Sequence, residues 1–537
     1  MVYSIYRNIR KNILPNPVSA FRKTNLLSYL SVLGMGAISS ISNQSYAAHL
    51  HTTGHFGLKA ETREGATQGS EEDFKQATTT SFSLYTEARI NEKVSFFLDL
   101  RLLDQNTSGA NYLGNTASSR TSCPTSTQRV KIGDVENNGT ATGEEVYTDE
   151  AVSQCDNEGF SGDSGYSPYY PVAQKAYLQL ATDYCLLQVG RRGRSLGMGI
   201  FLDDGNKPFS RNASVFDGIS CDVNIQKSQT LGFSIGYDKI AENNPASKDD
   251  LDQYFIALNW DDSAKSNDGF SKQISLYLSN ISGDSEVDPG SVDYKLFDLY
   301  TQFNLGVFVL KAEAVFRTGK SGEKRWESLA GEFNKKQKLD TINFALRTEW
   351  IVGESGTKTG VKPYETGTYE RSLMFFEYFR VPGDADGYEP NSSERDSEVK
   401  AMPLHRNFKP ALVLFNHPGS GSKDIAGIYY EDRMVNVNMY TLGYRYESVQ
   451  SGDFEAKLIM ASLLETYSES LDSDEVPVGY YGSDLGTELD LTYKFGLSAN
   501  TKMTLAAGYL IAGDALQTSD SSPKNTLTLQ TSLITTF

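Results

Sequence analysis

The sequence contains no apolar run after residue 50 that approaches the ~20 residues a membrane-spanning helix requires. Histidine is scarce, with 5 residues in 537, and no CxxC or Cys/His spacing typical of zinc ligands is present. No serine elbow typical of a hydrolase is visible. The formal net charge of -18 opposes binding to nucleic acid, whose phosphates are negative. These absences predict no enzyme, no cofactor, no metal site and no nucleic-acid partner.

What is abundant points to an antiparallel β protein. The chain has 31 Tyr, 27 Phe and 46 Gly but only 16 Pro. Aromatic residues favour strands, and proline interrupts their hydrogen-bond ladders. A chain of this length with few helical patterns is either several soluble β domains or one large barrel.

The first 47 residues have the composition of an export signal. Five basic residues precede an apolar run from Leu26 to Ile41, and Ser45-Tyr46-Ala47 supplies the small residues that a signal peptidase reads. The run is interrupted by Ser and Gly and is short for a spanning helix. We therefore predict that residues 1–47 are a signal peptide and that residues 48–537 are exported from the cytoplasm.

The last segment, Thr526–Phe537, alternates with a period of two residues. Leu527, Leu529 and Leu533 share one face, whereas Thr528, Gln530 and Ser532 share the other. Its length is about that of a tilted strand crossing a bilayer, and it ends on an aromatic residue. One alternative is an edge strand of a soluble sandwich. The membrane interpretation requires many partner strands that close around this one, because backbone groups in lipid must all be paired.

Similar alternating segments recur from Gly54–Arg63 to the C-terminus, and we count about eighteen. An even number is what a closed bacterial barrel requires. Links between successive segments alternate between long polar stretches and short turns such as those at Asn91 and Thr182–Asp183. Long extracellular loops and short periplasmic turns are typical of a transmembrane antiparallel β-barrel of the outer membrane. The terminal strand should then close against the strand that begins near Gly54, with Thr528, Gln530 and Ser532 facing the lumen.

The four cysteines fit an oxidising compartment. Cys123 and Cys155 lie in one long polar loop, and we predict that they pair. Cys185 opens one predicted strand and Cys221 closes the next, so both fall near the periplasmic end. That places them within reach of a second disulfide, although four cysteines allow three connectivities.

Charged residues on the polar faces of the strands are the candidates for the pore lining, because the lipid-facing positions must be apolar. The basic candidates include Arg89, Arg101, Arg317, Arg347, Lys457 and Lys494, and the acidic ones include Glu488 and Asp490. One interpretation is that they form salt-bridge ladders that stiffen the wall. The other is that a subset lines a constriction and selects solutes by charge.

An arginine cluster follows one strand. Arg191, Arg192 and Arg194 alternate with glycines, and Arg211 follows in the same loop. Guanidinium groups bind carboxylate and phosphate bidentately, and glycines let the backbone fold close into a lumen. We predict a constriction at this loop; the alternative is a contact with lipopolysaccharide phosphates at the outer rim.

Two stretches carry a resemblance to a known family. LQVGRRGRSLGMG followed by VFDGI, and LGTELDLTYKF…MTLAAGYLIAGDA (Leu485–Ala515), resemble strands of the alginate-export family of outer-membrane barrels. The resemblance implies an 18-stranded monomeric barrel that passes an anionic polysaccharide through an arginine-rich pore. It also implies that Arg191, Arg192 and Arg194 match the Gly-Arg position, and that Glu488 and Asp490 match a Glu-x-Asp pair.

The sequence thus predicts a bacterial outer-membrane channel for hydrophilic solutes, including anionic saccharides. Its expected partners are outer-membrane lipid, lipopolysaccharide, the solute or polysaccharide, and the barrel-assembly machinery. The alternative is a structural or adhesive surface protein whose barrel anchors large extracellular loops. An enzyme ranks third.

Overall fold

The structure is a computed structural model. It describes residues 49–64, 74–103, 125–137, 140–153, 172–210, 213–224, 231–241, 251–262, 270–284, 291–328, 331–356, 358–359, 366–383, 398–416, 423–425, 428–430, 434–466, 482–516 and 524–537. The predicted signal peptide, Cys123, Cys155 and Arg211 lie outside these ranges, so those predictions stay untested.

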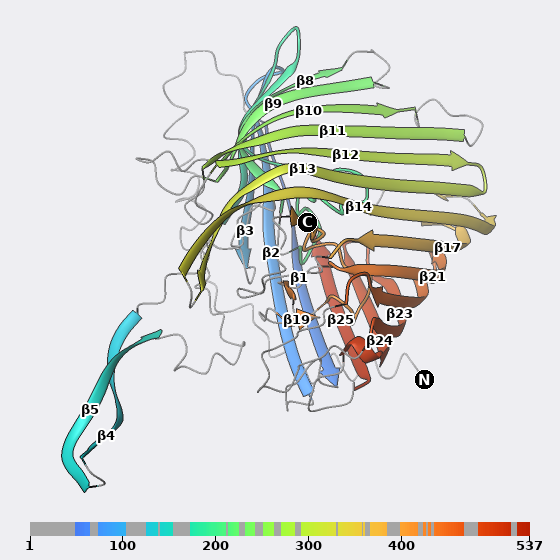
Figure 1. The fold of residues 1–537 in the computed structure, drawn as a ribbon. Helices are drawn as coiled ribbons and strands as arrows, with labels where there is room; N and C mark the ends of the chain where they lie inside the picture. The colour runs from blue at the N-terminus through green and yellow to red at the C-terminus, as the bar shows by residue number, and fades with distance from the viewer. Residues whose placement is uncertain are drawn as a thin grey trace, which may run out of the picture. The chain divides into compact units, whose positions relative to one another are not determined.

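Eighteen strands form one closed antiparallel barrel, as the sequence predicts. Each strand pairs with both of its barrel neighbours, and Figure 1 shows β8–β14 lying side by side in chain order. The barrel strands are β1 (His49–Glu64), β2 (Phe74–Arg89), β3 (Val94–Leu103), β6 (Val172–Ala181), β7 (Leu186–Gly193), β8 (Val215–Asn224), β9 (Leu231–Ala241), β10 (Leu251–Asp261), β11 (Phe270–Asp284), β12 (Ser291–Leu305), β13 (Phe308–Ser328), β14 (Gly331–Ser355), β17 (Glu370–Val381), β21 (Val437–Ser448), β22 (Asp453–Leu463), β23 (Asp484–Ser498), β24 (Thr501–Ala512) and β25 (Thr526–Thr536).

The remaining described elements are short or lie outside the barrel wall. β4 (Thr125–Asn137) and β5 (Thr140–Ser153) form a separate hairpin. β15 (Lys358–Thr359) pairs with β16 (Thr366–Gly367), and β19 (Lys423–Ile425) pairs with β20 (Ile428–Tyr430). β18 (Glu398–Val399) adds two residues in parallel to β14, and η3 (Asp514–Leu516) is one 3-10 turn. Within the described ranges no helix has the length and apolar content needed to cross a membrane.

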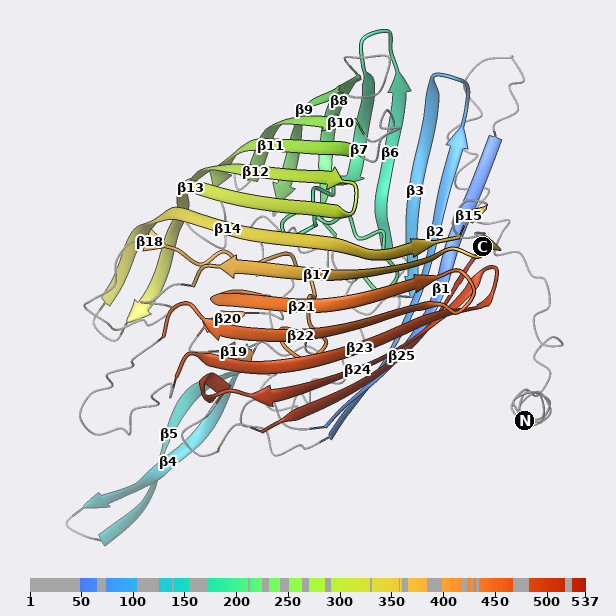
Figure 2. The ribbon, with the colours of Figure 1, turned by 90° about the vertical axis from the view of Figure 1, so that its right-hand side faces the viewer.

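The C-terminal strand closes the barrel. β25 pairs with β24 on one edge and with β1 on the other, and all three lie together in Figure 2. The Gly54 and Phe537 backbones exchange two hydrogen bonds, with N–O distances of 2.9 and 3.1 Å. Thr528 is fully buried on the inner side, whereas Leu527 and Leu529 are exposed on the outer side. The predicted closure near Gly54 and the inward direction of Thr528 are therefore confirmed.

The polarity of the wall is inverted relative to a soluble protein. On β10, Ile256 is 40% exposed and Leu258 is 38% exposed on the outer face, and the same holds for Leu529 on β25 at 51%. On the inner face, charged residues such as Glu313 and Glu488 have no exposed surface. The barrel has large apolar side chains on its outer surface and carboxylates on its inner surface. This distribution is expected when the surroundings of the barrel are apolar.

Several links between neighbouring strands are short turns. They comprise residues 90–93, 182–185, 306–307 and 499–500, and they fall at one end of the barrel because neighbouring strands alternate in direction. We call this the turn end and the opposite one the loop end. The disulfide Cys185–Cys221 joins β8 to the residue that precedes β7 at the turn end, with a Cα–Cα distance of 5.5 Å. This predicted pairing is confirmed.

Candidate functional site

A first inner segment, residues 194–210 between β7 and β8, folds into the lumen. Its Ile200 and Leu202 side chains are buried in the same apolar cluster as Phe216 on β8. Gly197 and Gly199 have positive φ values of 55° and 78°, which let the chain turn sharply. The turn brings Gly197 so close to the wall that a Cβ atom there would collide with the Glu313 carboxylate.

The first inner segment reaches from one side of the barrel to the other. At β13, the Met198 N–H donates a hydrogen bond to Glu313. Farther along the segment, the Arg101 guanidinium on β3 donates to the carbonyls of Gly205 and Ser210. The first inner segment is therefore held both by β3, near the first strand of the barrel, and by β13, about halfway round the wall.

A second inner segment, residues 400–416 between β17 and β21, covers another part of the lumen. The Asn343 side chain on β14 donates to the Met402 carbonyl at 2.9 Å, and Lys457 on β22 donates to the Pro410 carbonyl at 3.0 Å. Opposite β14, the buried carboxylate of Glu488 on β23 accepts the consecutive N–H groups of Leu412, Val413 and Leu414. These three donors lie at 2.8, 2.7 and 2.9 Å. Successive backbone N–H groups that converge in this way form a strong anion-binding nest.

The two inner segments contact each other inside the barrel. The His405 N–H donates to the Ile200 carbonyl at 2.8 Å, and the Asn407 amide donates to Asp203 Oδ1 at 3.1 Å. Side chains of both segments, Leu202 and Leu404 among them, belong to one buried apolar cluster. The segments therefore form a joint barrier that narrows the lumen.

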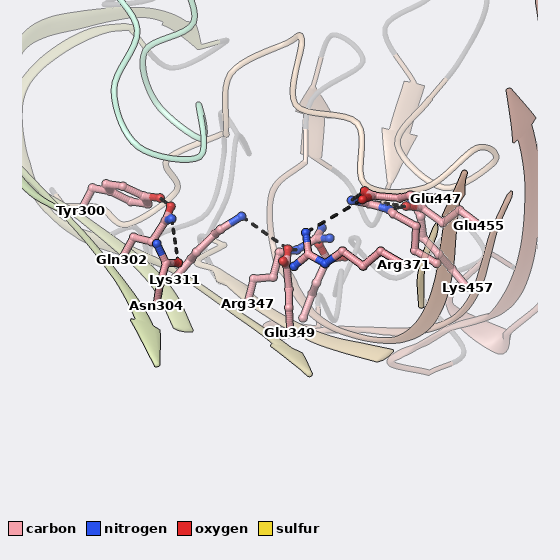
Figure 3. Close-up of polar contacts among 12 residues, drawn as sticks. Tyr300, Gln302, Asn304, Lys311, Arg347, Glu349, Arg371, Glu447, Glu455 and Lys457 are labelled. Atoms are coloured by element: carbon pink, nitrogen blue, oxygen red, sulfur yellow. Dashed lines mark hydrogen bonds and ion pairs between the residues drawn. The ribbon is translucent and has the colours of Figure 1, made fainter. Parts of the chain in front are cut away.

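A row of charged side chains follows the inner wall from β13 to β22. Figure 3 shows these side chains pointing away from the strands into the barrel. In the first half, Arg347 donates to Glu349 at 2.6 Å and to Glu377 at 2.5 Å, and Lys311 lies 3.4 Å from Glu349. In the second half, a carboxylate and a cation alternate from Arg371 through Glu447, Arg445 and Glu455 to Lys457.

One buried aromatic ring joins the two halves of this ionic row. The Arg347 guanidinium lies 4.5 Å from the centroid of the Phe375 ring, and the Arg445 guanidinium lies 5.7 Å from the same centroid. Most side chains of the row are partly exposed, with Arg347 at 17% and Arg445 at 29%. Since Arg445 precedes the link between β21 and β22 by a few residues, the row lies toward the turn end, where water reaches it.

The arginine cluster of Arg191, Arg192 and Arg194 is not part of the ionic row. The outward face of β7 carries Arg191, which is half-exposed and pairs bidentately with Asp217 at 2.9 and 2.6 Å. Arg192 and Arg194 point inward but are largely buried, and both pair with the carboxylate of Asp238. The Arg194 guanidinium also lies 3.6 Å from the centroid of the Phe255 ring.

The other predicted residues have three different placements. Arg101, Arg317, Lys457, Glu488 and Asp490 contact the inner segments, Arg317 through the Ala401 carbonyl at 3.0 Å and Asp490 through the Leu412 N–H at 3.1 Å. Arg347 belongs to the ionic row, and Lys457 belongs to it as well. Arg89 pairs with Glu87 at 2.9 Å near the turn end, and Lys494 is exposed on the inner face of β23.

Sequence reasoning missed the second inner segment and half of the ionic row. The composition of the second inner segment does indicate that it is buried, because Ala411–Phe415 is an apolar run within a long loop. Such a run needs a buried surface to cover it. The sequence does not identify Arg371 and Glu377 as inward residues. Both faces of β17 are apolar, so polarity does not distinguish the inward face from the outward one.

One buried carboxylate in the lumen lacks a hydrogen-bond donor. Neither side-chain oxygen of Asp298 on β12 has a partner among the described residues, and its side chain has no exposed surface. Glu313, which holds the first inner segment, lies on the adjacent strand one inward position further along. Two carboxylates this close in a buried site repel each other when both are charged.

Removing the charge of Asp298 is expected to stabilise the barrel. Asp298→Asn should raise the free energy of unfolding by roughly 1–3 kcal/mol, since a neutral amide costs less to bury than an unpaired carboxylate and does not repel Glu313. Urea unfolding in lipid vesicles measures this change. The exposed Asp293 on the outer face of the same strand gives the matched control, Asp293→Asn, which should have little effect. A loss of stability in Asp298→Asn would contradict this account.

The described residues contain no group of three or more His, Cys, Asp or Glu side chains arranged to hold a metal ion. No family model matches the chain, and no curated protein matches it. Membership of the alginate-export family therefore stays a prediction.

Several solved structures resemble the fold. Outer membrane protein OprD from Pseudomonas aeruginosa is 12% identical, with 91% of this chain and 94% of that chain covered and a TM-score of 0.41. OpdQ from the same organism is 11% identical, with 90% and 98% covered and a TM-score of 0.40. OccAB4 from Acinetobacter baumannii is 11% identical, with 92% and 100% covered and a TM-score of 0.39. At these TM-scores the likenesses carry no inference about solute or mechanism.

Proposed function

We propose that this chain is a channel of the bacterial outer membrane that lets hydrophilic solutes diffuse through its lumen. The inverted polarity of the wall is the observation that carries the proposal. Exposed apolar side chains outside a closed sheet suit lipid, and charged side chains inside suit water and polar solutes. Export through the signal peptide of residues 1–47, surrounding lipid and lipopolysaccharide, and insertion by the barrel-assembly machinery belong to the same proposal.

The proposed channel filters solutes in two stages. A solute that enters at the loop end first meets the barrier made by the two inner segments. Beyond it lies the ionic row, where five basic and four acidic side chains alternate along the wall. Fixed charges along a pore select solutes by charge, so the row sets the preference and the inner segments set the size limit. The mechanism involves no reaction and no cofactor.

Anionic saccharides are the solute class we favour. The resemblance to the alginate-export family points to them, and the row has one more basic than acidic side chain. The guanidinium groups of Arg347, Arg371 and Arg445 can donate to a carboxylate in pairs.

Conductance in planar bilayers tests the channel. The mature chain should produce discrete current steps, and vesicles that contain it should take up charged and neutral sugars of limited size. A correctly folded barrel that stays electrically silent would exclude the channel.

The alternative function is that of a structural or adhesive surface protein. The hairpin of β4 and β5 favours it, because its strands of 13 and 14 residues belong to a sheet separate from the barrel. Deleting residues 125–153 distinguishes the two functions. Loss of binding to cells or surfaces with unchanged conductance would support adhesion.

A further inference from the structure

Beside the ionic row, the inner wall carries a patch without charge. On β10, β11 and β12 most of the inward positions near the turn end are amides and hydroxyls, which we call the neutral patch. Its members are Asn259, Ser271, Gln273, Ser275, Gln302 and Asn304. Charged groups appear only at its borders, with Asp261 next to Gln273 and Lys311 next to Gln302 in the strand register.

Hydrogen bonds link these side chains into a ladder. The Tyr300 hydroxyl donates to Gln302 Oε1 at 2.7 Å, and Gln302 Nε2 donates to Asn304 Oδ1 at 3.1 Å. Asn304 Nδ2 then donates to the Ser271 hydroxyl. Figure 3 shows Tyr300, Gln302 and Asn304 on one side of Lys311, apart from the arginines of the ionic row.

Each amide of the ladder keeps half of its hydrogen-bonding capacity. An amide side chain has two N–H donors and an oxygen with two lone pairs. Gln302 uses one donor and one lone pair within the ladder, and Asn304 does the same. Both side chains are partly exposed, and within the described part of the chain each retains one donor and one acceptor that a solute in the lumen can use.

We propose that the neutral patch binds the hydroxyl groups of saccharides and other polyhydroxy solutes that pass through the channel. A hydroxyl group is both donor and acceptor, which matches the donor–acceptor pair left on each amide. Neighbouring strands lie about 5 Å apart, and inward positions on one strand lie about 7 Å apart, so the patch offers pairs at a spacing close to the size of a sugar ring. Charged groups bind more strongly to the oppositely charged side chains of the ionic row than to neutral amides and hydroxyls.

This inference rests on the proposed channel, and it assigns different groups of the solute to the ionic row and to the neutral patch. The ionic row would bind the carboxylates of a solute, and the neutral patch would bind the hydroxyl groups of the same solute. An uncharged oligosaccharide therefore probes the patch by itself.

The test adds maltohexaose to one side of a bilayer that contains the full mature chain and measures interruptions of the ion current. We expect interruptions whose frequency rises with sugar concentration. In the double variant Gln302→Ala and Asn304→Ala, the binding constant should fall about tenfold, because each neutral hydrogen bond contributes roughly 0.5–1.5 kcal/mol. The matched control is Thr301→Ala, which changes the outward face of the same strand and should leave the interruptions unchanged.

Three results would overturn the inference or its premise. Steady current without interruptions in the unaltered chain would remove the sugar site and leave the channel intact. Equal binding constants in the unaltered chain and the double variant would place the sugar elsewhere. Absence of any current would remove the proposed function itself. If the double variant does not assemble, Asn304→Ala alone decides between these outcomes, with an expected decrease of about threefold.

Discussion

Replacing Glu488 with alanine is expected to release the second inner segment and widen the channel. The substitution removes the carboxylate that accepts the consecutive N–H groups of Leu412, Val413 and Leu414, while Asp490 still accepts the Leu412 N–H. Each unsatisfied group costs roughly 1–3 kcal/mol, so a total of about 3 kcal/mol would raise the population of the detached segment about 100-fold. Single-channel recordings should show larger and noisier current steps than those of the unaltered chain.

Asp490 provides the graded control for this experiment. Among the residues that the structure describes, its carboxylate accepts one N–H group, that of Leu412 at 3.1 Å, and that group also has Glu488 as an acceptor. Asp490→Ala should therefore change the current less than Glu488→Ala. Because the two segments contact each other through His405 and Asn407, noise should also rise in Asn407→Ala. Identical recordings for Glu488→Ala and the unaltered chain would mean that the carboxylate does not hold the segment.

Neutralising part of the ionic row is expected to increase the permeability of the channel to cations relative to anions. The triple variant Lys311→Gln, Arg347→Gln and Arg445→Gln leaves two basic side chains facing four acidic ones. The potential along the wall becomes negative, and we expect the ratio of potassium to chloride permeability to rise about tenfold. Reversal potentials under a salt gradient measure this ratio directly.

Arg191 supplies the matched control for the ionic row. It carries the same charge as Arg347 but lies on the outer face of β7, paired with Asp217. Arg191→Gln should leave the permeability ratio unchanged. A change of selectivity in Arg191→Gln, or none in the triple variant, would show that the ionic row does not set the preference. Heat-modified migration in gels identifies variants that fail to form the barrel.

Most of the fold follows from local patterning. The alternation of Thr526–Phe537 predicts a strand whose one face is polar, and the structure places Thr528 inside and Leu529 outside. The strand count and the pair Cys185–Cys221 follow from similar reasoning, because a period of two and the direction of successive strands are properties of neighbouring residues.

The site was less predictable. Alternation correctly marks Arg101, Arg347 and Glu488 as inward residues, yet it says nothing about what meets them there. Arg192 is inward as well, but its guanidinium is buried against Asp238 from a strand 46 residues away. The sequence groups Arg191 with Arg192 and Arg194 in one cluster, although adjacent residues on a strand point to opposite faces.

The sequence by itself determined the barrel, its seam and the polarity of its two faces, because a strand's side chains alternate and lipid tolerates only one kind of face. Only the tertiary structure decided what narrows the lumen. Glu313 and Glu488 lie far apart on the wall and far in sequence from the segments they hold. Contacts of that kind depend on how the closed barrel brings distant strands around an infolded loop, and no local pattern contains that information.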